Sequence, residues 1–191
     1  TRLCLESLFA TTDTPYELIL VDNASTDGTG AYFLSLERKK RELSPHLKGL
    51  HLGLNPENKG FAKAANQGMK QAKGEFVCVL NNDLLFTPQW LSLLLEQIEK
   101  NKAGIIGPVC NAVSDVVQIP QLSAVSYSDT EAMLQQISRK VEKIDYKDTE
   151  WIAGFCVLIR REVINKIGLF DEKFGLGFCE DEDYCYRARY A

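Results

Sequence analysis

Polar side chains follow directly after apolar, strand-like runs at three places in the sequence. These groups are Asp22-Asn23 with Ser25, then Asn81-Asn82-Asp83, then the acidic run from Glu180 to Asp183. A polar group at the end of a buried strand is costly unless a hydrogen bond or a ligand satisfies it. In open α/β sheets, ligands bind at the carboxyl ends of the strands. The three groups are therefore candidate parts of one binding site.

The first group suits recognition of a nucleoside. Asp22 ends the run 16–22 and precedes a loop that contains Gly28 and Gly30. A carboxylate in that position can accept hydrogen bonds from a ribose hydroxyl or from a base edge. The alternative is that Asp22 or Asn23 only caps the turn, as short polar side chains often do.

The second group suits a divalent cation. The Asp83 carboxylate and the amide oxygens of Asn81 and Asn82 are hard ligands of the kind that Mg²⁺ and Mn²⁺ prefer. Only Asp83 carries charge, so a diphosphate would have to complete the coordination shell. Asp83 could instead cap the next helix, but Thr87-Pro88 already provides an N-cap and a first helical residue for a helix ending at Lys100.

The third group suits acid–base chemistry. Four successive carboxylates run from Glu180 to Asp183, between the apolar residues Phe178 and Tyr184. Crowding and apolar walls raise the pKa of a carboxyl toward the range that a general base needs. Negative charge is also favourable in the first turn of any helix, so a solvated helix start explains the same residues equally well.

A fourth cluster opens a predicted helix over 60–74. Asn58, Lys59, Lys63 and Asn66 lie around its start. A helix N-terminus favours anions, and Lys59 and Lys63 share one face because they are four residues apart. Lysines on a helix surface are just as often simply solvated.

The elements that position these groups alternate between strand-like and helical patterns, which predicts an α/β fold with a largely parallel sheet. We expect helices at the start of the chain and over 31–41, 60–74, 87–100 and 129–143, with Gly74 ending the third. We expect strands over 16–22, 49–55, 75–83 and 103–110. Residues 151–172 read as a strand followed by a short helix, and a Gly- and Phe-rich loop leads to the acidic helix start. No linker divides the 191 residues, so a single domain is expected.

Composition excludes several functional classes. The net charge of −4 argues against a nucleic-acid partner. No apolar run reaches the roughly 20 residues that span a bilayer. Six scattered cysteines without a C-x-x-C pair favour free thiols in a reducing cytoplasm. His46 and His51 lie away from the polar groups, which makes a His-based hydrolase or a zinc enzyme improbable.

Three stretches together resemble the inverting family 2 glycosyltransferases with the GT-A fold, and most closely the branch that includes rhamnosyltransferases. They are YELILVDNASTDGT (16–29), NPENKGFAKAANQGMKQAKGEFVCVLNNDLLFTPQWL (55–91) and WIAGFCVLIRREVINKIGLFDEKFGLGFCEDEDYCYRARY (151–190). The resemblance implies a Rossmann-like sheet with helices on both faces in one catalytic domain. It also implies that residues 1–110 bind the nucleotide sugar and that residues 111–191 bind the acceptor. The family's opening strand is missing before Thr1, which indicates a fragment of a longer protein.

The resemblance also implies roles for single residues. Asp181, with Glu180 beside it, corresponds to the catalytic base, and Asp83 corresponds to the acid that contacts Mg²⁺ or Mn²⁺. Trp151 and Gly154 correspond to the acceptor side. Asn81 stands where the family's metal motif begins with an acid, which implies phosphate-dependent metal binding. The expected nucleotide-binding residues are Asp22, Asn23, Ser25, Asn58, Lys59, Asn66 and Asn82.

The implied reaction moves a sugar from a UDP- or dTDP-linked donor to a hydroxyl of a glycan or lipid-linked acceptor, with inversion. The implied location is cytoplasmic, at the inner face of the membrane, with peripheral membrane association. Three alternatives remain. A nucleotidyltransferase would share the layered fold and the metal, an NAD-binding Rossmann domain would explain Asp22 but lacks G-x-G-x-x-G, and a nucleotide-sugar-binding domain without activity would share the site.

Overall fold

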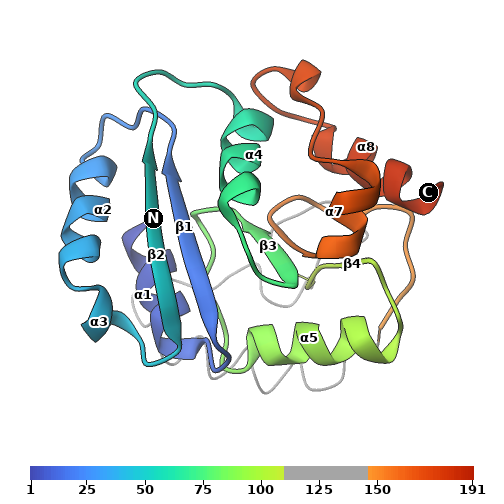
Figure 1. Cartoon of the computed structure of the whole chain (residues 1–191), viewed down its shortest axis with the longest axis horizontal. Helices are drawn as coiled ribbons and strands as arrows, with labels where there is room; N and C mark the ends of the chain where they lie inside the picture. The colour runs from blue at the N-terminus through green and yellow to red at the C-terminus, as the bar shows by residue number, and fades with distance from the viewer. Residues whose placement is uncertain (110–145) are drawn as a thin grey trace, which may run out of the picture.

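The computed structural model describes residues 1–109 and 146–191 (Figure 1). The helix expected over 129–143 lies outside these residues. The elements follow in the order α1 (Arg2–Thr11), β1 (Tyr16–Asp22), α2 (Thr29–Arg38), α3 (Lys40–Leu43), β2 (Leu47–Leu54), α4 (Phe61–Gln71), β3 (Phe76–Leu80), α5 (Trp90–Lys100), β4 (Ile105–Ile106), β5 (Cys156–Arg160), α7 (Arg161–Ile167), the 3-10 helix η2 (Glu172–Phe174) and α8 (Glu180–Arg189). This alternation confirms the predicted α/β class.

Three of the strands point the same way. β1 and β2 pair in parallel, with Asp22 opposite Leu54 at their carboxyl ends. Helix α4 starts beside Asn23, which donates to the carbonyl of Gly60 at 3.3 Å. The chain beyond α4 returns to the start of β1, where the N–H of Gly74 donates to Glu17 at 3.1 Å. β3 therefore begins at the same edge as β1, and their carboxyl ends meet at one edge.

The remaining pairings are antiparallel. β5 lies between β3 and β4 and runs opposite to both. Leu80, the last residue of β3, is opposite Cys156, the first residue of β5. The chain segment that precedes β5 is thereby brought to the edge where β3 ends. Strand–helix alternation did not predict this pairing, because an antiparallel partner looks the same as a parallel one in the sequence of a buried strand.

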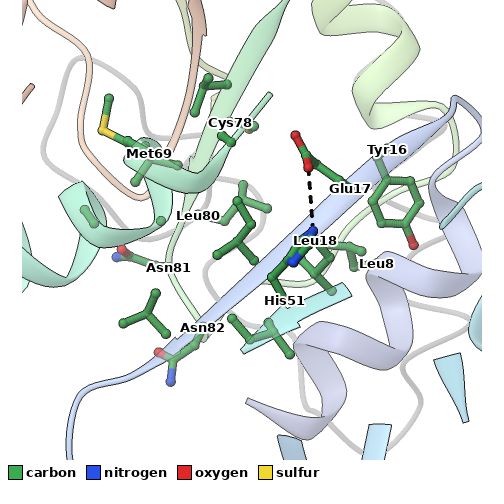
Figure 2. A pocket seen from close by; sticks show the side chains of 18 of the residues that line it. Leu8, Tyr16, Glu17, Leu18, His51, Met69, Cys78, Leu80, Asn81 and Asn82 are labelled. Atoms are coloured by element: carbon green, nitrogen blue, oxygen red, sulfur yellow. Dashed lines mark ion pairs between the residues drawn. The ribbon is translucent and has the colours of Figure 1, made fainter. Parts of the chain in front are cut away.

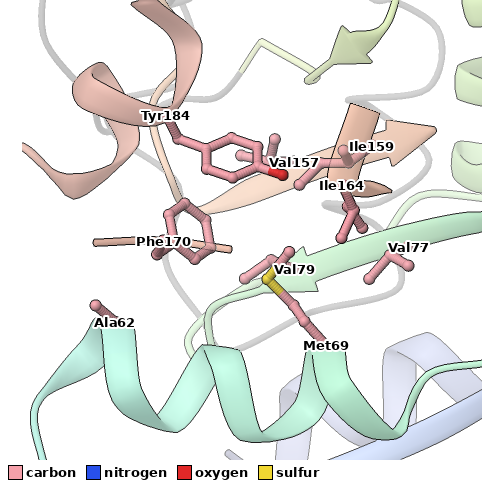
Figure 3. Close-up of a cluster of buried hydrophobic side chains, with 9 residues drawn as sticks. All are labelled: Ala62, Met69, Val77, Val79, Val157, Ile159, Ile164, Phe170 and Tyr184. Carbon is pink, nitrogen blue, oxygen red and sulfur yellow. The ribbon is translucent and has the colours of Figure 1, made fainter. Parts of the chain in front are cut away.

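Helices cover both faces of the sheets, as expected (Figure 1). On the β1–β2 pair, Leu20 and Leu50 pack against α1 and α2, while Gly68 of α4 lies beside Ile19 and Val21 on the other face. Val79 of β3 and Ile159 of β5 pack with α4, α7 and Tyr184 of α8 (Figure 3). The opposite face of β3 and β5 packs against α5. The burial of alternate residues on two faces stabilises the layers.

A cavity of about 1050 Å³ separates β1 from β3. Leu8 of α1 and Met69 of α4 lie on its two sides, and Leu18 and Leu80 line it from the strands (Figure 2). Within the part of the chain that the structure describes, no strand joins β1 to β3. Asn81 and Asn82 lie at the carboxyl-end mouth of the cavity (Figure 2).

Two predicted helix boundaries are wrong. α5 begins at Trp90 with Gln89 as its N-cap, so Thr87 does not cap it. The Trp90 ring stacks on Phe86 at 4.5 Å and donates to Thr12 at 3.1 Å, and this packing fixes a turn before the helix. α4 ends at Gln71, three residues before Gly74, because Ala72 is already extended.

The strands and α2 also differ slightly from the sequence-based ranges. α2 begins at Thr29 and β2 at Leu47, each two residues earlier than predicted, while β4 contains only Ile105–Ile106. In residues 1–109 and 146–191, no helix has the length and apolar composition needed to cross a bilayer.

Candidate active site

The polar mouth of the cavity gathers five of the predicted site residues. They are Asp22, Asn23, Ser25, Asn58 and Asn82. They come from the ends of β1 and β3 and from the loop before α4, which are far apart in the sequence. The common carboxyl edge of β1, β2 and β3 brings them together, as the sequence analysis expected for this class of sheet.

Asp22 caps the turn that follows β1, the structural role that its position allowed. Its side chain is 7% exposed, and Oδ1 accepts a hydrogen bond from the N–H of Ser25 at 3.0 Å. This bond holds the turn in which Ala24 adopts a left-handed φ of 67°. A Cβ on Gly30 would lie 3.0 Å from Oδ2, so only glycine lets α2 approach the carboxylate this closely. Asp22 also lines the cavity.

Asn23 is engaged entirely within the protein. Its Oδ1 accepts from Asn55 Nδ2 at 3.1 Å and from the N–H of Lys59 at 3.0 Å. Its Nδ2 donates to Asn58 Oδ1 at 2.8 Å and to the Gly60 carbonyl at 3.3 Å. A side-chain amide has two donors and two acceptor lone pairs, so these contacts use all of them. Asn23 therefore organises the loop before α4, and no polar group of its side chain remains for a nucleotide base.

Asn66 does not belong to the nucleotide site. Its side chain is 1% exposed, and it donates to the Phe170 carbonyl at 2.9 Å and to Glu172 at 3.1 Å. Its Oδ1 accepts from the N–H of Phe170 at 3.1 Å. The predicted assignment is wrong because Asn66 points to the segment after α7 and away from the cavity. It links α4 to the chain that leads to the acidic helix.

The segment after β3 is held by two contacts. The N–H of Asn81 donates to the Phe155 carbonyl at 2.8 Å, and Asn82 Nδ2 donates to Thr1 Oγ1 at 2.8 Å. Asp83 is exposed and forms no ion pair within the described segments. In those segments, no three His, Cys, Asp or Glu side chains gather as a metal cluster. The chemistry of the Asp83 carboxylate suits a hard cation, with Asp83 as its single charged protein ligand, although Asp83 is not among the residues that line the cavity.

Asp181 is fixed by two main-chain donors. The N–H of Gly154 donates to Oδ2 at 2.7 Å, and the N–H of Glu182 donates to Oδ1 at 3.0 Å. A Cβ on Gly154 would lie 3.1 Å from Oδ2, so glycine at this position permits the contact. Gly154 precedes Phe155, which accepts from Asn81. Two successive residues therefore connect the loop that carries Asp83 to the predicted base.

The other acidic residues of α8 differ in their surroundings. Glu180 is 7% exposed, and its buried Oε2 has no hydrogen-bond partner in the described structure. Burial raises the pKa of Glu180 above its usual range, and the charge of Asp181 adds to this effect. Asp183 pairs with Arg187 at 2.7 Å, and Arg187 also binds the carbonyls of Ile167 and Leu169. Arg187 therefore attaches α8 to the end of α7, and Asp183 orients the Arg187 guanidinium.

The remaining predicted residues lie near the loop before α4 or near Asp181. Lys59 is placed at the cavity mouth through its main chain, while Lys63 is exposed on α4. Trp151 is half-buried three residues before Gly154, and its carbonyl accepts from Thr149 at 3.1 Å. The N–H of Phe61 donates to the Leu176 carbonyl at 3.1 Å, so the loop before α8 lies against the start of α4.

Sequence reasoning missed Asn55 and Gln67. Their amides exchange two hydrogen bonds, at 2.8 and 3.1 Å, and Asn55 continues the contact to Asn23. Asn55 directly follows β2, so the strand-end signal that identified Asp22 and Asn81 also applied to it. Gln67 carries no such signal, because a polar residue on a helix is ordinarily solvated.

A comparison with protein families matches residues 1–168 to the model described as glycosyl transferase family 2. Among curated proteins, the chain is 29% identical over 181 residues to the O-antigen biosynthesis protein RfbC of Myxococcus xanthus, covering 91% of the chain and 14% of that protein. It is 26% identical to the N-acetylglucosaminyl-diphospho-decaprenol L-rhamnosyltransferase of Mycobacterium tuberculosis, covering 94% of the chain and 62% of that protein. The chain thus spans less than two thirds of these relatives.

Solved structures share the fold at low identity. The mannosyltransferase PcManGT of Pyrobaculum calidifontis, in complex with GDP-Man and Mn²⁺, has a TM-score of 0.60 and 22% identity, over 88% of this chain and 41% of that one. TarS of S. aureus, in complex with UDP, has a TM-score of 0.63 and 21% identity, over 98% of this chain and 50% of that one. The fold is therefore that of GT-A glycosyltransferases, and the family match over most of the length shows that the chain belongs to glycosyl transferase family 2.

Proposed function

We propose that the chain is the catalytic part of an inverting glycosyltransferase that moves a sugar from a nucleoside diphosphate to an acceptor hydroxyl. The observation that carries the proposal is the link between Asp181 and the segment after β3. Gly154 binds the Asp181 carboxylate and Phe155 binds the main chain of Asn81, so base and donor loop share one support. In this assignment residues 1–110 bind the donor and residues 111–191 bind the acceptor.

Asp22, Ser25 and Asn58 line the part of the cavity assigned to the donor. Asp83 would hold Mg²⁺ or Mn²⁺ together with diphosphate oxygens, and a cation bound there would neutralise charge on the departing diphosphate. Two of the structural neighbours contain Mn²⁺ with a nucleotide or a nucleotide sugar, which supports this choice of cation. Lys59 adds a positive charge in the loop before α4, next to the cavity residue Asn58.

Asp181 is the proposed general base. It takes the proton of the acceptor hydroxyl while the hydroxyl oxygen attacks the anomeric carbon. The bond from that carbon to the diphosphate oxygen breaks, and its electron pair leaves with the diphosphate. One displacement of this kind inverts the anomeric configuration. The two N–H donors keep the Asp181 carboxylate oriented, and each of its oxygens has a further lone pair that can receive the proton.

The proposed donor and acceptor classes rest on the family resemblance, with support from the relatives. A UDP- or dTDP-linked hexose or rhamnose is the proposed donor, and a glycan or lipid-linked sugar is the proposed acceptor. The name of the mycobacterial relative specifies a decaprenol-linked acceptor and rhamnosyl transfer. For this chain, such an acceptor implies cytoplasmic action at the inner membrane face, with peripheral membrane association. Trp151 and Gly154 belong to the acceptor side in this assignment.

The test is transfer by the full-length protein. It is incubated with UDP- and dTDP-sugars and lipid-linked acceptors, and the released nucleoside diphosphate and the anomeric configuration of the product are measured. We expect Mn²⁺-dependent release with inversion, and loss of both with Asp181→Asn. A parallel incubation with a sugar phosphate and UTP or dTTP tests for a nucleotidyltransferase. Formation of a nucleotide sugar and pyrophosphate there would contradict the proposal.

A further inference from the structure

We propose that Asn23, Asn55, Asn58 and Gln67, here called the amide chain, form a positioning device that sets the affinity for the donor nucleotide. The inference rests on the proposed function, because it takes the cavity mouth as the donor site. It concerns two residues, Asn55 and Gln67, that do not line the cavity. They act through Asn23 on the loop 55–60.

The amide chain starts on α4 and crosses to the end of β2. Asn55 Nδ2 donates to Gln67 Oε1 at 2.8 Å, and Gln67 Nε2 donates back to Asn55 Oδ1 at 3.1 Å. The reciprocal pair alone would survive a flip of both amides, so its orientation is set from the loop. The N–H of Lys59 can only donate, which directs Asn23 Oδ1 toward it, and Asn55 Nδ2 then donates to the same Oδ1 at 3.1 Å.

Asn23 joins the amide pair to the main chain of the loop. With Oδ1 directed toward Asn55 and the N–H of Lys59, Nδ2 must point to Asn58 Oδ1 and the Gly60 carbonyl. Asn58 Oδ1 also accepts from the N–H of Gly60 at 2.9 Å. Reversing either amide would place two donors or two acceptors against each other. Gln67 therefore does not set the orientation, but it holds Asn55 against Asn23, and Asn23 binds the loop through Lys59, Asn58 and Gly60.

The orientation determines what the loop presents to a ligand. Because Asn58 Oδ1 is held by Asn23 and Gly60, the Nδ2 donor of Asn58 is directed to the other side of its side chain. Asn58 is exposed and lines the cavity. The ammonium of Lys59 forms no ion pair in the part of the chain that the structure describes. A neutral donor and a cation side by side suit the negative oxygens of a diphosphate.

The device matters because the middle of the loop has few other contacts. Main-chain bonds hold its ends, from the N–H of Asn55 to the Asp22 carbonyl at 2.9 Å and from the N–H of Phe61 to the Leu176 carbonyl at 3.1 Å, while residues 56–58 are all exposed. A loop that is ordered before binding spares the ligand the entropic cost of ordering it, and this raises affinity without a new contact. Loss of the amide chain should therefore weaken donor binding even though neither Asn55 nor Gln67 touches the donor.

The experiment uses three variants and two readouts. Gln67→Leu removes both bonds to Asn55. Asn55→Asp keeps the shape but places a carboxylate oxygen against the oxygens of Asn23 and Gln67. Gln71→Leu is the matched control, because Gln71 is exposed one turn further along α4. The first readout is hydrogen exchange at the N–H groups of Lys59 and Gly60, and the second is titration with UDP and dTDP in the presence of Mn²⁺.

We expect faster exchange at Lys59 and Gly60 in Gln67→Leu and Asn55→Asp, and no change in Gln71→Leu. Nucleotide affinity should fall roughly tenfold in the same two variants. In the full-length enzyme, the donor KM should rise while kcat stays unchanged, because the chemical groups are untouched. Gln67→Glu retains the acceptor for Asn55 and should lie between the wild type and Gln67→Leu.

Three results would overturn the inference, and they are distinguishable. If exchange in Gln67→Leu equals that in Gln71→Leu, the amide chain does not hold the loop. If exchange rises but nucleotide affinity is unchanged, the loop is held but does not set affinity. If the wild-type full-length protein binds neither nucleotide, the proposed donor site itself is wrong.

Discussion

The N–H of Gly154 donates a hydrogen bond of 2.7 Å to Oδ2 of Asp181, and no larger residue could take the place of Gly154 without moving that carboxylate. The contact joins the segment before β5 to the first turn of α8. Since Phe155 binds Asn81 at 2.8 Å, the same segment also supports the loop after β3. The proposed role of Asp181 as general base depends on this connection, and the first two predictions test it.

Asp181→Asn should reduce kcat by about 10²–10⁴-fold, the range associated with loss of a general base. The amide oxygen can still accept from Gly154, so the fold and nucleotide binding should be retained. Transfer rates and thermal unfolding of the full-length variant measure both. Glu182→Gln is the control, because Glu182 is one residue away on α8. Full transfer activity in Asp181→Asn would rule out Asp181 as the base.

Gly154→Ala should lower kcat with little change in the donor KM. The added Cβ would lie 3.1 Å from Oδ2 and 3.2 Å from Cβ of Asp181, so the carboxylate must shift. Gly53→Ala is the matched control, since its Cβ would meet Val21 at an ordinary 3.7 Å. Steady-state kinetics of both variants measure kcat and the donor KM. Equal kcat values would show that the position of Asp181 tolerates displacement.

Asn66→Leu should destabilise the fold and leave the nucleotide affinity of the folded protein unchanged. The substitution leaves the N–H and the carbonyl of Phe170 without their partner in a buried site. Two such groups cost about 2–6 kcal/mol in the free energy of unfolding. A domain of this size should then lose roughly 4–24 °C in Tm. A selective loss of nucleotide binding at unchanged Tm would restore Asn66 to the donor site.

The comparison of Asn66 with Asp22 shows how far sequence could predict the site. Asp22 and Asn81 were predicted because they are polar residues at the ends of buried strands, and Asp181 because it corresponds to the base in the family resemblance. Asn66 was assigned to the same site because it lies on the helix that opens there. Which face of α4 points to the cavity depends on packing against β1, β3 and the segment after α7, and this packing is not a local property of the sequence.

In the fold, too, local patterns could be predicted from the sequence, while features set by long-range packing could not. Strand and helix types follow from apolar periodicity and were predicted along most of the described chain. The start of α5 was not, because the packing of Trp90 on Phe86 and Thr12 overrides the capping preference of Thr87. The antiparallel pairing of β5 also depends on long-range contacts. Asn55 and Gln67 were missed for a related reason, since a reciprocal amide pair exists only after β2 and α4 meet.

Glu180→Gln should stabilise the protein at neutral pH and lose this advantage in acid. Burial raises the pKa of Glu180, so the folded state binds its proton more tightly than the unfolded state does. The favourable contribution of that proton is complete below the unfolded pKa of about 4.3 and is lost as pH rises through the higher folded pKa. Tm values of both proteins, measured across this range, test the sign. A Tm difference that does not change with pH would contradict it.

The central claim is that the carboxyl-end mouth of the cavity, with Asp83, binds a nucleoside diphosphate through a divalent cation. Calorimetric titration with UDP and dTDP, with and without Mn²⁺, tests it most directly. Asp83→Ala is the test variant, and Glu96→Ala is the control because Glu96 is an exposed carboxylate on α5. We predict Mn²⁺-dependent binding that Asp83→Ala abolishes and Glu96→Ala preserves. Equal binding by wild type and Asp83→Ala would contradict the claim.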